Sequence, residues 1–169
     1  MSVSLQIKQS LNSIKIMMIE DDNIMASLIR DVLDIMGFRN IVFHKDAKLA
    51  LQDIHQNAYD LILCDWKMQG MSGIEFTKTL RIFELTKKRY TPLIMITGKA
   101  QEEDVRAARD AGVTEYLIKP FSVVAMCEKI KAILERPRDF VISDAYIGPD
   151  RRRRNDAKLI PNGIDRRKS

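Results

Sequence analysis

Short apolar runs alternate along the chain with longer segments in which apolar residues recur at the three- and four-residue spacing of an amphipathic helix. Polar or turn-forming residues bound the apolar runs, which is typical of buried strands. These runs lie at residues 14–19, 40–43, 61–64, 92–97 and 115–118. Because a helical segment follows each run, the sequence predicts an α/β fold with a parallel sheet and helices on both of its faces.

Residues that start and stop helices stand between these runs. Ser72 and Glu75 have the spacing of a capping box, and Asp46 and Ser122 are candidate N-caps of two other helices. Gly37 follows the last apolar position of the first helix and is expected to end it. These signals support the division of the chain into five strand-then-helix units.

The composition is typical of a soluble globular protein, with 46% hydrophobic and 30% charged residues in a chain of 169. No apolar run approaches the roughly 18 residues of a membrane-spanning helix. The first residues lack the basic and apolar segments of a secretory signal. Cys64 and Cys127 both lie in apolar surroundings, so we expect reduced thiols in a cytoplasmic protein that does not insert into a membrane.

The net charge of +5 is concentrated near the C-terminus. From residue 137 onward there are nine Lys or Arg and five Asp or Glu residues, against 19 and 18 in residues 1–136. A Gly-x-Asp-Arg-Arg pattern occurs in this segment at 148–152 and again at 163–167, and two copies are too few for a repeat fold. We therefore predict an N-terminal extension (1–13), one domain (14–136) and a basic, flexible tail (137–169).

Polar side chains with complementary chemistry follow four of the predicted strands. Glu20 and Asp21 follow the first strand, Asp65 the third, Thr97 ends the fourth, and Lys119 follows the fifth. The carboxyl ends of parallel strands meet at one edge of the sheet, where open α/β sheets bind ligands. Three carboxylates there favour Mg²⁺, which binds one or two carboxylates together with waters and phosphate oxygens. A metal, an ammonium and a hydroxyl around one carboxylate are suited to phosphoryl transfer.

In this order, Glu20-Asp21, Asp65, Thr97 and Lys119-Pro120 resemble the receiver domain of two-component response regulators. The resemblance covers about residues 14–136, and the 44 positions between Asp21 and Asp65 are similar to the family spacing. The resemblance implies a flavodoxin-like, doubly wound, five-stranded parallel sheet of strand order 2-1-3-4-5. It also implies a cis peptide bond before Pro120.

The resemblance further implies a role for each residue of the site. Asp65 would accept a phosphoryl group from the phosphohistidine of a histidine kinase or a histidine phosphotransfer protein. Glu20, Asp21, Asp65 and the backbone carbonyl of Lys67 would bind Mg²⁺, and Lys119 would pair with the phosphoryl oxygens.

Two further positions would transmit the signal. Thr97 would move to bond the phosphoryl group, and Tyr116 would turn inward behind it, so that partner binding changes.

The chain departs from the family pattern in the loops around the site. Gln69 stands where the family often has proline, four residues after the phosphorylated aspartate, so the loop is expected to be more mobile. Lys67 and Lys99, two residues after Asp65 and Thr97, lie where the family varies most and are expected to tune the lifetime of the phosphoryl group. Asp22 is assigned mainly to capping the first helix.

Other functions were compared with this interpretation. A flavin-mononucleotide-binding flavodoxin is disfavoured because the Glu20-Asp21-Asp22 loop would repel phosphate. An aspartate-based phosphatase usually needs a second acid two residues after the nucleophile, where Lys67 stands.

A third possibility concerns the tail, which has the charge for phosphate contacts with nucleic acid but lacks interleaved aromatic residues. We retain it as an alternative, an adaptor whose tail binds nucleic acid or another phosphate ligand through Arg151, Arg152, Arg153, Arg154, Arg166 and Arg167. The favoured interpretation is a single-domain response regulator that is not an enzyme with a separate output domain. Its signal would pass to a downstream protein that the sequence does not identify.

Overall fold

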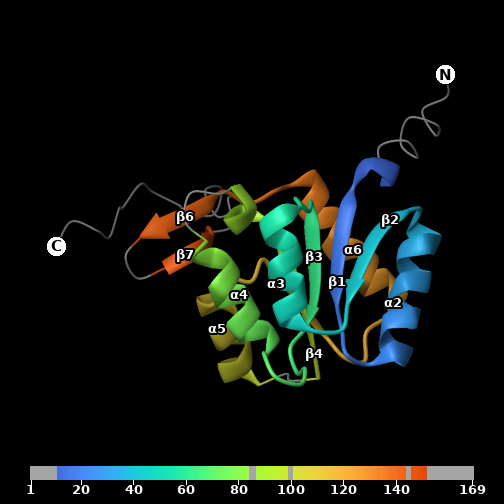
Figure 1. Ribbon diagram of the computed structural model, residues 1–169, viewed down its shortest axis with the longest axis horizontal. Coiled ribbons are helices and arrows are strands. Elements are labelled where there is room, and N and C mark those ends of the chain that lie inside the picture. The colour runs from blue at the N-terminus through green and yellow to red at the C-terminus, as the bar shows by residue number, and fades with distance from the viewer. Residues whose placement is uncertain (1–10, 84–86, 99–100, 144–145, 152–169) are drawn as a thin grey trace, which may run out of the picture.

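The computed structural model describes residues 11–83, 87–98, 101–143 and 146–151 (Figure 1). It contains one five-stranded parallel sheet in the order β2-β1-β3-β4-β5, as predicted. The strands are β1 (Lys15–Ile19), β2 (Asn40–His44), β3 (Leu61–Asp65), β4 (Leu93–Thr97) and β5 (Glu115–Ile118). The helices are α2 (Asn23–Met36), α3 (Ala47–Gln56), α4 (Gly73–Arg81), α5 (Glu102–Asp110) and α6 (Val123–Glu135), with a short 3-10 helix η1 (Lys87–Tyr90) before β4.

The predicted helix caps are present. The Asp46 carboxylate accepts hydrogen bonds at the start of α3, and the Ser72 hydroxyl and Glu75 carboxylate form a reciprocal capping box on α4. The Ser122 hydroxyl accepts a hydrogen bond from the N–H of Ala125 at the start of α6. Gly37 ends α2 with a φ of 95°, a left-handed conformation that glycine adopts without a steric penalty.

Alternate residues of each central strand are buried on opposite faces of the sheet, in two separate apolar cores. On β1, Ile16 and Met18 pack in a core that includes residues of α2 and α6, whereas Met17 and Ile19 pack in a core that includes residues of α3, α4 and α5. Figure 1 shows α3 and α4 in front of the sheet and α6 behind it. Burial on both faces explains why these strands are continuous apolar runs in the sequence. No helix in the described ranges is long and apolar enough to cross a membrane.

A second, two-stranded sheet follows α6. β6 (Phe140–Ser143) and β7 (Tyr146–Pro149) pair antiparallel, and Gly148 and Pro149 are buried. These residues were expected to belong to the flexible tail, and the hairpin was not predicted from the sequence. Its register is Phe140 opposite Pro149 and Ser143 opposite Tyr146. Residues 152–169 and the first ten residues lie outside the described ranges, so the predictions of a flexible tail and of an N-terminal extension stay predictions there.

Candidate functional site

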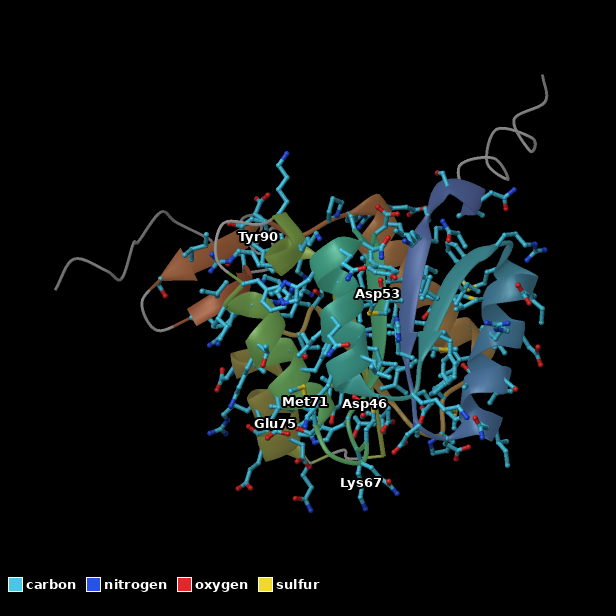
Figure 2. All side chains as sticks on the ribbon, viewed as in Figure 1. Asp46, Asp53, Lys67, Met71, Glu75 and Tyr90 are labelled. Carbon is cyan, nitrogen blue, oxygen red and sulfur yellow. The ribbon has the colours of Figure 1, made fainter. Side chains whose placement is uncertain are left out.

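The site lies at the edge of the large sheet where the parallel strands end. Asp65 and Thr97 are the last residues of β3 and β4, and Glu20 and Lys119 come directly after β1 and β5. In Figure 2, Lys67 marks this edge and Tyr90 marks the opposite, amino edge of the sheet. The parallel register places the strand ends side by side, with Asp65 opposite Ile96 and Ile19 opposite Cys64.

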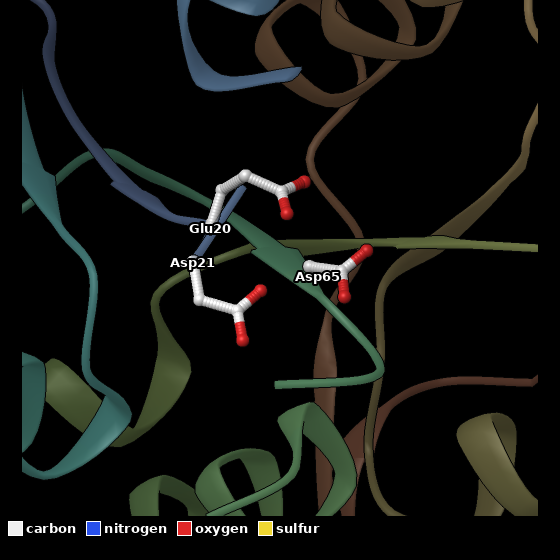
Figure 3. A group of neighbouring side chains, drawn as sticks. All are labelled: Glu20, Asp21 and Asp65. Atoms are coloured by element: carbon white, nitrogen blue, oxygen red, sulfur yellow. The ribbon is translucent and has the colours of Figure 1, made fainter. Parts of the chain in front are cut away.

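Three carboxylates converge at this edge (Figure 3). Each of Glu20, Asp21 and Asp65 offers an oxygen, and these oxygens lie within 4.8 Å of one another. Glu20 and Asp65 are buried, with 1% and 6% of their surface exposed, whereas Asp21 is accessible to solvent. A group of hard, negatively charged oxygens with one open side fits a divalent cation such as Mg²⁺.

One cation of the chain already lies among these acids. The Lys119 ammonium donates to Asp65 Oδ1 at 2.6 Å and to Glu20 Oε2 at 3.0 Å. Burial disfavours the charged form of Lys119, but the hydrogen bonds to Asp65 and Glu20 outweigh it and raise the Lys119 pKa. Burial also raises the pKa of Glu20, and the nearby Asp65 charge acts in the same direction against the hydrogen bond from Lys119. Two buried carboxylates share one ammonium, which carries enough charge to neutralise one of them.

Backbone N–H groups of the surrounding loops hold the individual carboxylates. Asp65 Oδ2 accepts a hydrogen bond from the N–H of Lys67 at 2.7 Å. Asp21 Oδ2 accepts one from the N–H of Gln69 at 2.9 Å, which links two loops that are 48 residues apart. The contribution of Gln69 was not predicted from the sequence, because the residue type does not reveal where a backbone N–H will donate.

The start of α4 packs closely against the end of β3. The N–H of Gly73 donates to the carbonyl of Trp66 at 2.9 Å. A Cβ atom at position 73 would collide with the Asp65 carbonyl oxygen and lie 2.9 Å from the Met95 sulfur. Only glycine fits this approach, so Gly73 helps to fix where the Asp65 backbone lies.

Thr97 and Tyr116, the predicted switch pair, lie near one another. Thr97 is buried and Tyr116 is half-buried. Burial raises the pKa of Tyr116, while a hydrogen bond with the Thr97 side chain acts in the opposite direction. The Tyr116 ring meets the Trp66 ring edge-on, with 6.2 Å between the ring centroids. The residue that follows Asp65 therefore contacts the aromatic residue of the predicted switch.

The remaining predicted positions are distributed as follows. The Lys119–Pro120 peptide bond is cis, as predicted. Lys67 is exposed beside the site, and Asp22 caps α2 through its carboxylate, which accepts from the N–H groups of Ile24 and Met25. Lys99 lies outside the described residues.

Of the predicted tail residues, the structure describes Arg151 alone. It pairs with Asp110 at the end of α5 at 2.8 Å, and its guanidinium lies over the Tyr146 ring. Arg152, Arg153, Arg154, Arg166 and Arg167 lie outside the described residues.

Residues 16–131 match the model of the response regulator receiver domain family. The chain is 34% identical over 122 residues to the chemotaxis protein CheY of Pseudomonas aeruginosa, which covers 72% of this chain and 97% of that protein. It is similar to a two-component response regulator from Clostridium difficile, with a TM-score of 0.66 and 26% identity over 73% of this chain and 98% of the other.

A third relative bears on the acidic cluster. The receiver domain of a sensor histidine kinase from Pseudomonas aeruginosa PAO1 has a TM-score of 0.63 and 26% identity, over 69% of this chain and 93% of the other. That structure holds a magnesium ion coordinated in its active-site cleft.

Proposed function

Because the chain belongs to the response regulator receiver domain family, we propose that it is a phosphorelay switch that accepts a phosphoryl group on Asp65. The observation that carries the proposal is the contact between Asp65 Oδ1 and the Lys119 ammonium at 2.6 Å, inside a cluster of three carboxylates. An isolated acid at a strand end could be a turn residue. An acid that shares one half-buried ammonium with a second acid, beside a third, is arranged for charge neutralisation.

The donor set suits Mg²⁺, which Glu20, Asp21, Asp65 and the backbone carbonyl of Lys67 would hold. When bound, the ion supplies positive charge against the phosphoryl oxygens. The charges that converge there support this assignment, because three carboxylates lie together and Lys119 supplies one positive charge to the two that are buried.

The phosphoryl donor of a receiver domain is a phosphohistidine, on a histidine kinase or on a histidine phosphotransfer protein. An oxygen of the Asp65 carboxylate attacks phosphorus, the bond between phosphorus and the imidazole nitrogen breaks, and that nitrogen keeps the electron pair. Lys119 holds the carboxylate beforehand and pairs with a phosphoryl oxygen afterwards. The N–H of Lys67, which donates to the other Asp65 oxygen, fixes the orientation of the carboxylate.

The phosphorylation signal passes through Thr97 and Tyr116. In the proposed switch the Thr97 hydroxyl moves to a phosphoryl oxygen, Tyr116 turns inward, and the affinity of the neighbouring surface for a downstream protein changes. The hydrogen bond between Thr97 and Tyr116 and the edge-on contact of Tyr116 with Trp66 support this route. Lys67 and Lys99 tune the lifetime of the phosphoryl group from the loops after β3 and β4.

Intact-mass measurement after incubation with Mg²⁺ and acetyl phosphate tests the phosphoacceptor. We expect one phosphoryl adduct on the wild type, and its loss on treatment with hydroxylamine, which cleaves acyl phosphates. Asp65→Asn should give no adduct, whereas the matched control Asp31→Asn, an exposed acid on α2, should behave as the wild type. A hydroxylamine-sensitive adduct on Asp65→Asn would refute the assignment.

A further inference from the structure

Asp21 has a different hydrogen-bond partner from the other two acids of the cluster. Glu20 and Asp65 are buried and share the Lys119 ammonium. Asp21 is accessible to solvent, and the hydrogen bond recorded for its carboxylate in the described part of the chain comes from the N–H of Gln69, at 2.9 Å. The most solvent-accessible acid of the cluster therefore depends on one backbone donor from another loop.

Electrostatics explain what this donor does. Oxygens of the three carboxylates lie within 4.8 Å of one another, a distance at which like charges repel appreciably even near a protein surface. Because Asp21 has an open side, repulsion from Glu20 and Asp65 favours rotamers that turn its carboxylate toward water. A hydrogen bond to a charged acceptor opposes that rotation.

We propose that Gln69 is a positioning residue for divalent-cation binding, and that it acts through its backbone N–H by holding Asp21 in the cluster. The inference rests on the proposed function, since it assumes that the three carboxylates bind Mg²⁺. The Gln69 side chain is not required. What matters is that the residue at position 69 carries an N–H, which proline lacks.

The chain therefore offers a matched pair of substitutions. Gln69→Ala keeps the backbone donor and removes the exposed side chain, whereas Gln69→Pro removes the donor. Mg²⁺ affinity of the wild type and both variants is measured by titration of the full chain, followed through amide proton–nitrogen spectra. The same spectra report whether each variant is folded.

We expect Gln69→Ala to bind Mg²⁺ within about twofold of the wild type and Gln69→Pro to bind it about fivefold more weakly, as the loss of one typical solvent-exposed hydrogen bond predicts. Equal affinity of the two variants would overturn the positioning role and leave the proposed function intact. A wild type that binds no Mg²⁺ would instead refute the metal site itself.

A second measurement does not depend on the proline variant, which also restricts the backbone of Met68. In metal-free protein, hydrogen exchange at the Gln69 amide should speed up about fivefold in Asp21→Ala relative to the wild type, since this substitution removes the acceptor. Exchange at the Lys67 amide, which donates to Asp65, should stay unchanged and serves as the internal control. Unchanged exchange at Gln69 would contradict the proposal.

Discussion

Cations at the two edges of the large sheet have different kinds of partner. At the carboxyl edge, one ammonium, that of Lys119, lies between two buried carboxylates. At the amino edge, the guanidinium of Arg81 is 2% exposed and binds no acid among the described residues. It donates instead to the backbone carbonyls of Gly112, Arg89 and Thr91, at 3.0, 2.6 and 2.9 Å.

Further contacts follow the same rule at the amino edge. The Lys88 ammonium donates to the carbonyls of Ile54 and His55 at the end of α3, both at 2.7 Å. Phe140 of the hairpin lies over the Arg81 guanidinium, with 5.0 Å between the guanidinium carbon and the ring centroid. Cations at this edge satisfy carbonyls at the ends of secondary-structure elements.

The difference between the edges separates function from architecture. At the amino edge, the Arg81 guanidinium is paired with fixed carbonyl dipoles, and its Nη2 is buried without a hydrogen-bond partner among the described residues. At the carboxyl edge, two buried carboxylates share the single positive charge of Lys119, and a third carboxylate lies beside them. Surplus buried charge costs stability, so it is expected where a charged ligand is to be bound.

The largest test of this comparison removes the cation of the amino edge. Arg81→Met fills a similar volume but leaves two buried carbonyls and one half-buried carbonyl without their donor, so we expect the free energy of unfolding to fall by about 3 kcal/mol. Chemical denaturation of the metal-free protein measures it. Burial lowers the pKa of Arg81 to about 9, so the guanidinium of the wild type is still charged at neutral pH. The full decrease in the free energy of unfolding should therefore be measurable at neutral pH.

Lys78→Met is the matched control, because Lys78 is an exposed cation on the same helix. We expect a change within about 0.5 kcal/mol. Acetyl phosphate should still phosphorylate the folded fraction of Arg81→Met. If Arg81→Met were as stable as the control, the amino edge would not have the architectural role assigned to it.

The carboxyl edge should respond with the opposite sign. Glu20→Gln removes one buried negative charge while a polar side chain stays beside Lys119. Because burial in the folded protein disfavours charged Glu20, we expect the free energy of unfolding at pH 7 to rise when metal is chelated. Denaturation in the presence of a chelator measures the change.

Added Mg²⁺ separates charge relief from a general effect of the substitution. Saturating Mg²⁺ should stabilise the wild type by mass action and should stabilise Glu20→Gln less, since one ligand is lost. The advantage of the variant should therefore shrink or reverse. A Glu20→Gln protein that is less stable than the wild type without metal would contradict the account of surplus charge.

The carboxyl edge was accessible to prediction because each of its residues follows an apolar run directly. Glu20, Asp65, Thr97 and Lys119 are read in order from the sequence, and the parallel sheet brings them together. The loop contacts that hold these side chains could not be predicted in this way. Gln69 was considered for the flexibility of its loop, but its contribution is a backbone N–H that every residue except proline has.

The amino edge escaped prediction for a different reason. Arg81 stands in the last turn of α4, where an arginine is usually solvated, and nothing in its neighbours indicates burial. Gly112 lies in the turn after α5 and has a φ of 91°. A Cβ atom at that position would also approach the Ile147 carbonyl oxygen of β7 to 2.6 Å, so the same glycine admits the hairpin. Such long-range contacts between short segments leave no periodic signal.

The smallest expected effect lies where the hairpin meets α5. Arg151 pairs with Asp110 at 2.8 Å, and both side chains are largely exposed. Solvent and salt screen such a pair, so Arg151→Ala should lower the free energy of unfolding by at most about 0.5 kcal/mol. Phe140 over Arg81, and not this ion pair, should therefore hold the hairpin in place. Hydrogen exchange at the amides of Val141 and Gly148, which lie opposite one another in the two strands, should then be the same in Arg151→Ala and the wild type. Faster exchange across both strands of the variant would show that the exposed pair anchors the hairpin, and the amino edge would then depend on surface charge as well as on buried donors.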